Sequence, residues 1–137
     1  MRIMAIDYGD AHTGIAISDP TGFLAGFTTV INAYRPEAVA EQVAALAKEH
    51  GVEELVLGHP INMDGTRGPR SEKAQAMKAL LEETTSLPVV LWDERRTTID
   101  AHQILMNSGK NAKKRKKVVD AVAATLILEG YLNSLPK

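Results

Sequence analysis

The chain of 137 residues contains no cysteine, few aromatic residues and no long apolar run. The lack of cysteine excludes disulfides, thiolate nucleophiles and cysteine-ligated zinc. No apolar stretch approaches the roughly 18 residues of a membrane-spanning helix, and no basic segment followed by a signal-peptide core opens the chain. We therefore expect a cytoplasmic protein that does not bind a membrane. Aromatic residues make up only 4% of the chain, and no cluster of them is visible along the sequence.

Length and composition indicate one globular domain, residues 1–137. The hydrophobic fraction of 45% and the charged fraction of 24% are those of an ordinary globular protein. A chain of this size buries a real core but is too short to form two lobes that close over a substrate. No pattern indicates its oligomeric state.

The net charge of −1 conceals a strongly basic segment. Six of the sixteen Lys and Arg residues lie between Lys110 and Lys117. Five of these are consecutive: Lys113, Lys114, Arg115, Lys116 and Lys117. Such a run is either a phosphate-binding arm or a solvated linker.

The order of apolar patterns and turn residues predicts an α/β fold. Three short strands joined by Gly- and Pro-bearing turns suggest an antiparallel meander, and two later strands follow helices. The expected strands are 2–7, 13–18, 25–31, 54–57 and 88–92. The expected helices are 36–50, 71–85, 97–107 and 118–132. Together they predict a five-stranded mixed sheet, a three-strand antiparallel meander plus two parallel strands, with helices on both faces.

Acidic residues end two of these strands and lie near the start of the last helix. Asp7 closes an apolar strand, where it is either a turn former or a charge that a cation compensates. Asp93 and Glu94 follow the fifth strand. Asp120 comes one turn into the last helix, where it either stabilises the helix N-terminus or contributes to a site. Because parallel strands bring their carboxyl ends to one edge, we expect these acids to converge there.

Three carboxylates at one edge repel one another unless divalent cations lie between them. Two ions about 3.5–4 Å apart are the usual arrangement for phosphodiester cleavage. Oxygen-only ligation favours Mg²⁺ or Mn²⁺ over zinc, and the four histidines show no paired metal-ligand spacing. The pattern predicts a two-metal nuclease.

Four ordered motifs resemble those of the YqgF family and span nearly the whole chain. They are Ala5–Gly9 with Thr13–Ala16, Leu57–Gly65, Asp93–Thr98 and Lys113–Ala124. The resemblance implies an RNase H-like fold related to the RuvC Holliday-junction resolvases. It also implies a nuclease that matures the 5′ end of pre-16S ribosomal RNA, and family members are described in both ways.

The resemblance assigns the catalytic and metal-binding acids to Asp7, Glu94 and Asp120. We expect a metal-activated water to attack the phosphorus in line, with Asp7 bridging the ions and the other two acids completing one ligand set each. Related resolvases carry a fourth acid one helical turn beyond the third, where this chain has Ala123. Metal binding is therefore expected to be weaker or to depend more on the nucleic acid.

Two departures from the family pattern concern the fit of the substrate. His59 stands where the family loop usually has Leu, in Gly-His-Pro instead of Gly-Leu-Pro. Arg96 replaces the Leu that usually follows Asp-Glu-Arg. Neither change removes an acid.

Basic residues are expected to hold the backbone phosphates without reading the base sequence. They are Arg70, Arg95 and the run Lys113–Lys117. In the long loop after residue 58, we regard His59, Asn62 and Asp64 as possible substrate contacts. Asp64 precedes Gly65, so it is also a strong turn signal.

Three alternatives to a nuclease acting on precursor ribosomal RNA stay open. A nucleotide-binding ATPase of the actin and sugar-kinase type has a similar opening strand and hairpin but needs two lobes. A resolvase of branched, four-way DNA uses the same acids and needs a symmetric dimer. A nucleic-acid-binding accessory factor without catalysis needs the basic run but no metal. No aromatic platform or 2′-hydroxyl signal in the sequence separates RNA from DNA.

Overall fold

The computed structural model describes residues 2–9, 11–19, 25–59, 69–93 and 112–134, with side chains except at 59, 69–71, 93 and 112–121. Five strands form one sheet in the order β3-β2-β1-β4-β5. The strands are β1 (Arg2–Asp7), β2 (His12–Ser18), β3 (Ala25–Asn32), β4 (Val52–His59) and β5 (Val89–Asp93).

The sheet combines an antiparallel meander with two parallel strands, as predicted. β1 pairs antiparallel with β2 and parallel with β4, β2 pairs antiparallel with β3, and β4 pairs parallel with β5. Because β1, β4 and β5 are parallel, Asp7, His59 and Asp93 end their strands at the same side of the sheet. We call this side the carboxyl edge.

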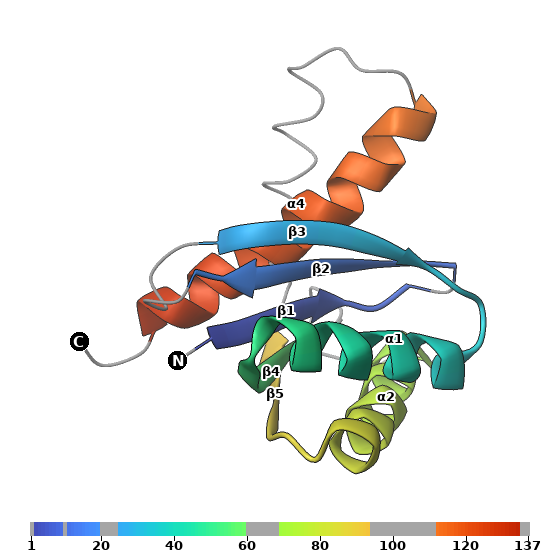
Figure 1. Ribbon diagram of the computed structural model, residues 1–137. Coiled ribbons are helices and arrows are strands. Elements are labelled where there is room, and N and C mark those ends of the chain that lie inside the picture. Colours follow the sequence, from blue (N-terminus) through green and yellow to red (C-terminus); the bar gives the residue numbers. More distant parts are fainter. Residues whose placement is uncertain (1, 10, 20–24, 60–68, 94–111, 135–137) are drawn as a thin grey trace.

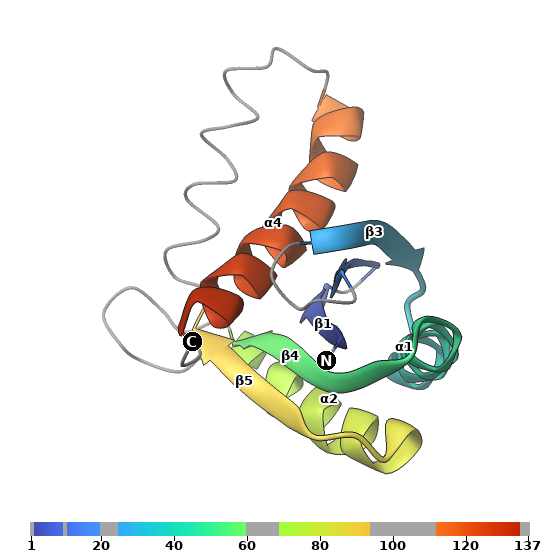
Figure 2. The ribbon, with the colours of Figure 1, turned by 60° about the vertical axis from the view of Figure 1, so that its left-hand side comes forward.

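Helices cover both faces of the sheet (Figure 1). The first two, α1 (Pro36–His50) and α2 (Pro69–Thr85), lie side by side on one face. The last, α4 (Ala112–Ser134), crosses the other face diagonally, as the turned view in Figure 2 also shows. The predicted α/β architecture with helices on both faces is confirmed.

Each face of the sheet has its own apolar core. Along β1, Met4 and Ile6 belong to the cluster shared with α1 and α2, whereas Ile3 and Ala5 belong to the cluster shared with α4. Successive side chains of a strand point to opposite faces, which explains this division. The same alternation shows on which face of the sheet each residue of β1 lies, up to Asp7 at its end.

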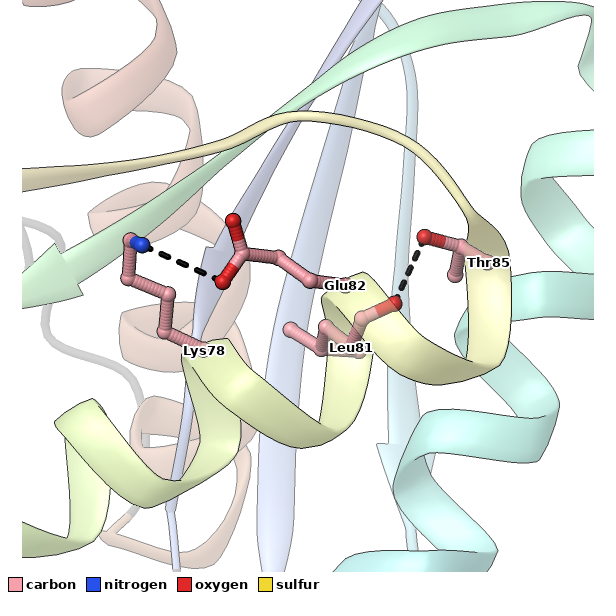
Figure 3. A network of polar contacts seen from close by, with 4 residues as sticks. All are labelled: Lys78, Leu81, Glu82 and Thr85. Carbon is pink, nitrogen blue, oxygen red and sulfur yellow. Dashed lines mark hydrogen bonds and ion pairs between the residues drawn. The ribbon is translucent and has the colours of Figure 1, made fainter.

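Residues at the ends of α1 and α2 terminate these helices before the chain returns to the sheet. Gly51 follows α1 with φ +67°, the left-handed conformation that glycine adopts without strain. At the end of α2, the Thr85 hydroxyl donates to the Leu81 carbonyl at 2.7 Å and accepts the Leu87 N–H at 3.1 Å. Figure 3 shows the Leu81 contact beside the Lys78–Glu82 ion pair, which spans one helical turn at 3.2 Å.

Aromatic residues fasten α4 to β4 and β5. The Tyr131 hydroxyl donates a hydrogen bond to the Glu54 carboxylate, and its ring lies edge-on to Trp92 with centroids 5.8 Å apart. Burial, followed by the Glu54 contact, raises the pKa of Tyr131 to about 12. A Cβ at Gly130 would lie 3.3 Å from the Trp92 ring, so glycine lets this ring approach the helix closely.

The structure corrects two predictions about α4. The helix begins at Ala112 instead of 118, so the basic run lies inside its first turns and is not a linker. Its binding of phosphates stays a prediction. Lys and Arg are good helix formers, and no Pro or Gly separates the run from the apolar part. The apolar pattern of this helix also predicts that Val122 and Leu126 face inward. Both are half-buried, whereas Ala123, Ala124 and Ile127 are buried.

The predicted helix 97–107 lies outside the described residues. Among the helices that are described, none is long and apolar enough to span a membrane.

Candidate active site

Asp7 lies at the carboxyl end of β1, the middle strand of the sheet, and is half-buried. Ile3 and Ala5 point toward α4, and the alternation along the strand places Asp7 on the same face. The acid therefore sits at the carboxyl edge on the side that α4 covers. This is the position that the sequence predicted for a functional carboxylate.

Glycines flank Asp7 on both neighbouring strands. Gly14 of β2 pairs directly with Asp7, and Gly58 of β4 follows Leu57, the partner of Ile6. Ala16 and Val56 point toward α4, so positions 14 and 58 lie on that face as well. Both positions beside Asp7 on the neighbouring strands are therefore occupied by residues without a side chain.

The hairpin between β1 and β2 forms a tight turn directly after Asp7. The Gly9 N–H donates to the Thr13 hydroxyl at 3.4 Å, and Thr13 is fully buried. A Cβ at Gly9 would lie 2.3 Å from the His12 carbonyl oxygen, closer than any real contact. Only glycine therefore fits this turn, two residues after the acid.

The second predicted acid, Glu94, lies outside the described residues, but the strand that leads to it is described. Trp92 contacts the α4-side cluster, and Asp93 pairs with His59 at the carboxyl edge. Asp93, the next residue, therefore belongs to the opposite face of β5 from Trp92.

The third predicted acid, Asp120, lies in α4, and its side chain is not among those described. Helical spacing puts position 120 on the same side of α4 as Ala123, Ala124 and Ile127, which are buried against the sheet. Ala123, which stands in place of a fourth acid, is 4% exposed and packs in the interior.

The predicted nucleic-acid contacts are placed only in part. The run Lys113–Lys117 lies in α4 and Arg70 in the first turn of α2, with no side chain described for any of them. His59 ends β4. Arg95, Asn62 and Asp64 lie outside the described residues.

No group of three His, Asp or Glu side chains that could hold a metal occurs within the described part of the chain. Two of the three predicted acids have no described side chain, so the three-acid site stays a prediction. The residues that sequence reasoning missed are the glycines around Asp7. Their signal was a glycine at position 14, inside an otherwise apolar strand, which often marks a close approach to a backbone or ligand.

The profile of the RuvX family, described as "Holliday junction resolvase", matches residues 1–134. The chain belongs to the RuvX family. Its relatives are similar over their whole length. A protein of Halothermothrix orenii named "Putative pre-16S rRNA nuclease" is 45% identical over 133 residues, 97% of this chain and 95% of its own. A protein of the same name from Bacillus subtilis is 44% identical over 98% of this chain and 99% of its own.

Solved structures with low sequence identity share the fold of this RuvX-family chain. Thermus thermophilus RuvC with a Holliday junction has a TM-score of 0.63 at 14% identity, covering 98% of this chain and 97% of that one. Fowlpox virus resolvase with junction DNA has a TM-score of 0.63 at 15% identity, with both chains fully covered. A Thermus thermophilus ROK hexokinase has a TM-score of 0.51 at 23% identity but is covered to 38%, against 75% of this chain. The predicted RNase H-like fold is confirmed.

Replacing Gly9 by alanine tests the hairpin that holds Asp7. The new Cβ meets the backbone of His12, so the hairpin must open, and we expect the free energy of unfolding to fall by about 1–3 kcal/mol. Nucleic-acid cleavage should fall as well, because Asp7 moves with the turn. Denaturant unfolding and a cleavage assay measure the two effects.

Gly51→Ala is the matched control for this variant. A Cβ there meets nothing within 4 Å, and its positive φ alone costs about 1 kcal/mol. It should lower stability and leave cleavage unchanged. Wild-type cleavage by a stably folded Gly9→Ala protein would contradict the role given to the turn.

Proposed function

We propose that this protein is a metal-dependent endonuclease that hydrolyses phosphodiester bonds, with precursor 16S ribosomal RNA as its substrate. The observation that carries the proposal is Asp7, a half-buried acid at the carboxyl end of the middle strand, flanked by Gly14 and Gly58. A carboxylate at the end of a buried strand suits a divalent cation, and the glycines place no side chain beside it on the neighbouring strands. The names of the 41–45% identical relatives support the choice of substrate.

The strand alternation supports Glu94 over Asp93 as the second acid. Trp92 points toward α4, so a residue two positions later returns to that face if the chain continues in extended conformation. Asp7 is on this same face. Asp93 is on the other.

Helical spacing supports Asp120 as the third acid. Position 120 precedes Ala124 by one turn and Ile127 by two, and both residues pack on the sheet face that carries Asp7. Position 120 therefore lies on the side of α4 that packs on the sheet farther along the helix. The proposal therefore draws its three acids from β1, from the segment after β5 and from α4.

These acids form an oxygen donor set, which suits Mg²⁺ or Mn²⁺. When bound, such ions activate a water and neutralise the charge that develops on the phosphate. Asp7, Glu94 and Asp120 hold them, and Arg70 and Arg95 position the phosphate backbone. The interior position of Ala123 leaves the site one acid short of the related resolvases, so nucleic-acid phosphates are expected to contribute to metal binding.

The helical conformation of the basic run limits how many phosphates it can contact. Successive residues of a helix point about 100° apart, so five consecutive basic residues cannot all face one strand. Spacing of three and four residues puts Lys113, Lys116 and Lys117 on one side of α4. We propose that these three residues, instead of all five, contact the backbone.

The number of contacts can be measured from the salt dependence of binding. The three phosphate contacts of α4 contribute about −2 to −2.7 to the slope with which the logarithm of the binding constant falls with the logarithm of salt concentration. Replacing Lys113, Lys116 and Lys117 by Gln should make the slope shallower by about this amount, and replacing Lys114 and Arg115 should change it little. Equal effects of the two sets would contradict the helical-face assignment.

A cleavage assay of Asp7→Asn tests the function itself. The substitution keeps the shape of the side chain and removes its charge, so we expect at least about a 100-fold loss of Mg²⁺- or Mn²⁺-dependent cleavage of precursor 16S RNA. Asp19→Asn, next to the opposite end of β2, is the matched control and should keep full activity. Wild-type activity of a folded Asp7→Asn protein would refute the metal site and favour an accessory factor that only binds.

Resolution of Holliday junctions is the second candidate, because the profile of the family carries that description. The same assay with a four-way DNA junction separates the two substrates. Paired, symmetric cuts in the junction require a dimer, so sedimentation of the protein with and without junction accompanies the assay.

A further inference from the structure

A groove with a volume of about 620 Å³ lies next to the proposed active site, on the side of the sheet that α1 and α2 cover. Its apolar floor comes from α2, and its rim comes from the chain after β1 and the segment that opens α1. The residues used below are Tyr8, Tyr34, Glu37, Lys73, Met77 and Leu80.

Tyr34 gives this groove an exposed aromatic wall. Its side chain is 82% exposed, and among the described residues the only other large exposed apolar side chain is Phe27, at 38%. The floor residue Met77 is buried. An aromatic ring held in solvent beside an apolar floor is unusual in a small domain and typical of a binding surface.

Charged side chains of both signs line the groove. Lys73 lines it directly. The acid in the lining, Glu37, forms an ion pair with Arg35 at 3.9 Å.

The groove adjoins the end of β1 that carries the proposed cleavage site. Tyr8 lines the groove and directly follows Asp7, so their Cα atoms are about 3.8 Å apart. Tyr8 packs against the core on the α1–α2 side, whereas Asp7 is on the α4 side. A strand that passes Asp7 and crosses the carboxyl edge enters the groove at Tyr8.

We propose that this groove binds an unpaired nucleotide of the substrate, next to the cleaved bond, with its base stacked on Tyr34 and its phosphate near Lys73. The proposal rests on the nuclease function given above and specifies its substrate class. A base within a duplex stacks on its neighbours, while an unpaired base can turn out and stack on an aromatic side chain. The groove thus favours a single-stranded extension over a fully paired junction.

Binding of labelled oligonucleotides to the full-length protein without divalent metal tests this site. We use one sequence as single-stranded RNA, as single-stranded DNA and as a duplex, and follow fluorescence anisotropy. Tyr34→Ala should weaken binding of the single strands by roughly 5- to 150-fold, the effect of losing one base–aromatic stack. Tyr34→Phe keeps the ring and should bind like wild type. Duplex binding should be unchanged in both variants.

Phe27→Ala is the matched control, because Phe27 is the other exposed aromatic side chain in the described part of the chain and contacts His50 at the far end of α1. It should leave binding unchanged. Equal loss from Phe27→Ala and Tyr34→Ala would overturn the proposal, and so would wild-type single-strand affinity in Tyr34→Ala. A monomer–dimer shift on sedimentation of Tyr34→Ala would also overturn it, because the groove would then bind a second copy of the chain.

A base analogue separates this inference from the nuclease proposal. With 2-aminopurine in the single strand, stacking on Tyr34 predicts quenching that Tyr34→Ala abolishes and Asp7→Asn preserves. If quenching is absent while Asp7-dependent cleavage is present, the groove assignment fails and the nuclease stands. If quenching follows Tyr34 and no cleavage occurs, the nuclease fails and the groove stands.

Discussion

The end of the middle strand is the constraint on which the proposed function depends. β1 is paired on both sides and covered on both faces, so its residues from Ile3 to Ile6 are apolar and buried. Alternation along this strand then leaves no freedom at position 7, which must lie on the α4 side. A charged group there is costly unless a cation compensates it. The strand pairing that forms the sheet therefore also fixes the position of the carboxylate on which the proposed function depends.

The surroundings of Asp7 are built to leave it accessible. Gly14 and Gly58 remove the side chains that neighbouring strands would place beside the acid, and Gly9 permits the tight turn after it. Farther along, Trp92 and Gly130 hold the end of β5 against α4. Small residues and close packing thus bring α4 close to the strands β1 and β5 on one face of the sheet.

Much of this fold could be predicted from the sequence, because the apolar pattern of the strands and the residues that begin and end helices are local signals. Gly51 after α1 and the bounds of β1 are examples. The start of α4 could not be predicted, because Lys and Arg read as solvent-exposed in either a helix or a linker. Tyr8 and Tyr34 line one groove although 25 residues separate them, so their proximity depends on the pairing of β1, β2 and β3. Asp7 was predicted correctly as the end of a strand. That Gly14 lies opposite it could not be predicted, because this depends on the register between β1 and β2.

Location of a bound ion tests the central claim most directly. Crystals of the protein with a non-hydrolysable single-stranded oligonucleotide and Mn²⁺ would reveal the ion by its anomalous scattering. The account predicts a peak coordinated by carboxylate oxygens of Asp7, Glu94 and Asp120, which is lost in Asp7→Asn. A Mn²⁺ peak that does not contact Asp7, or one that persists unchanged in Asp7→Asn, would contradict it.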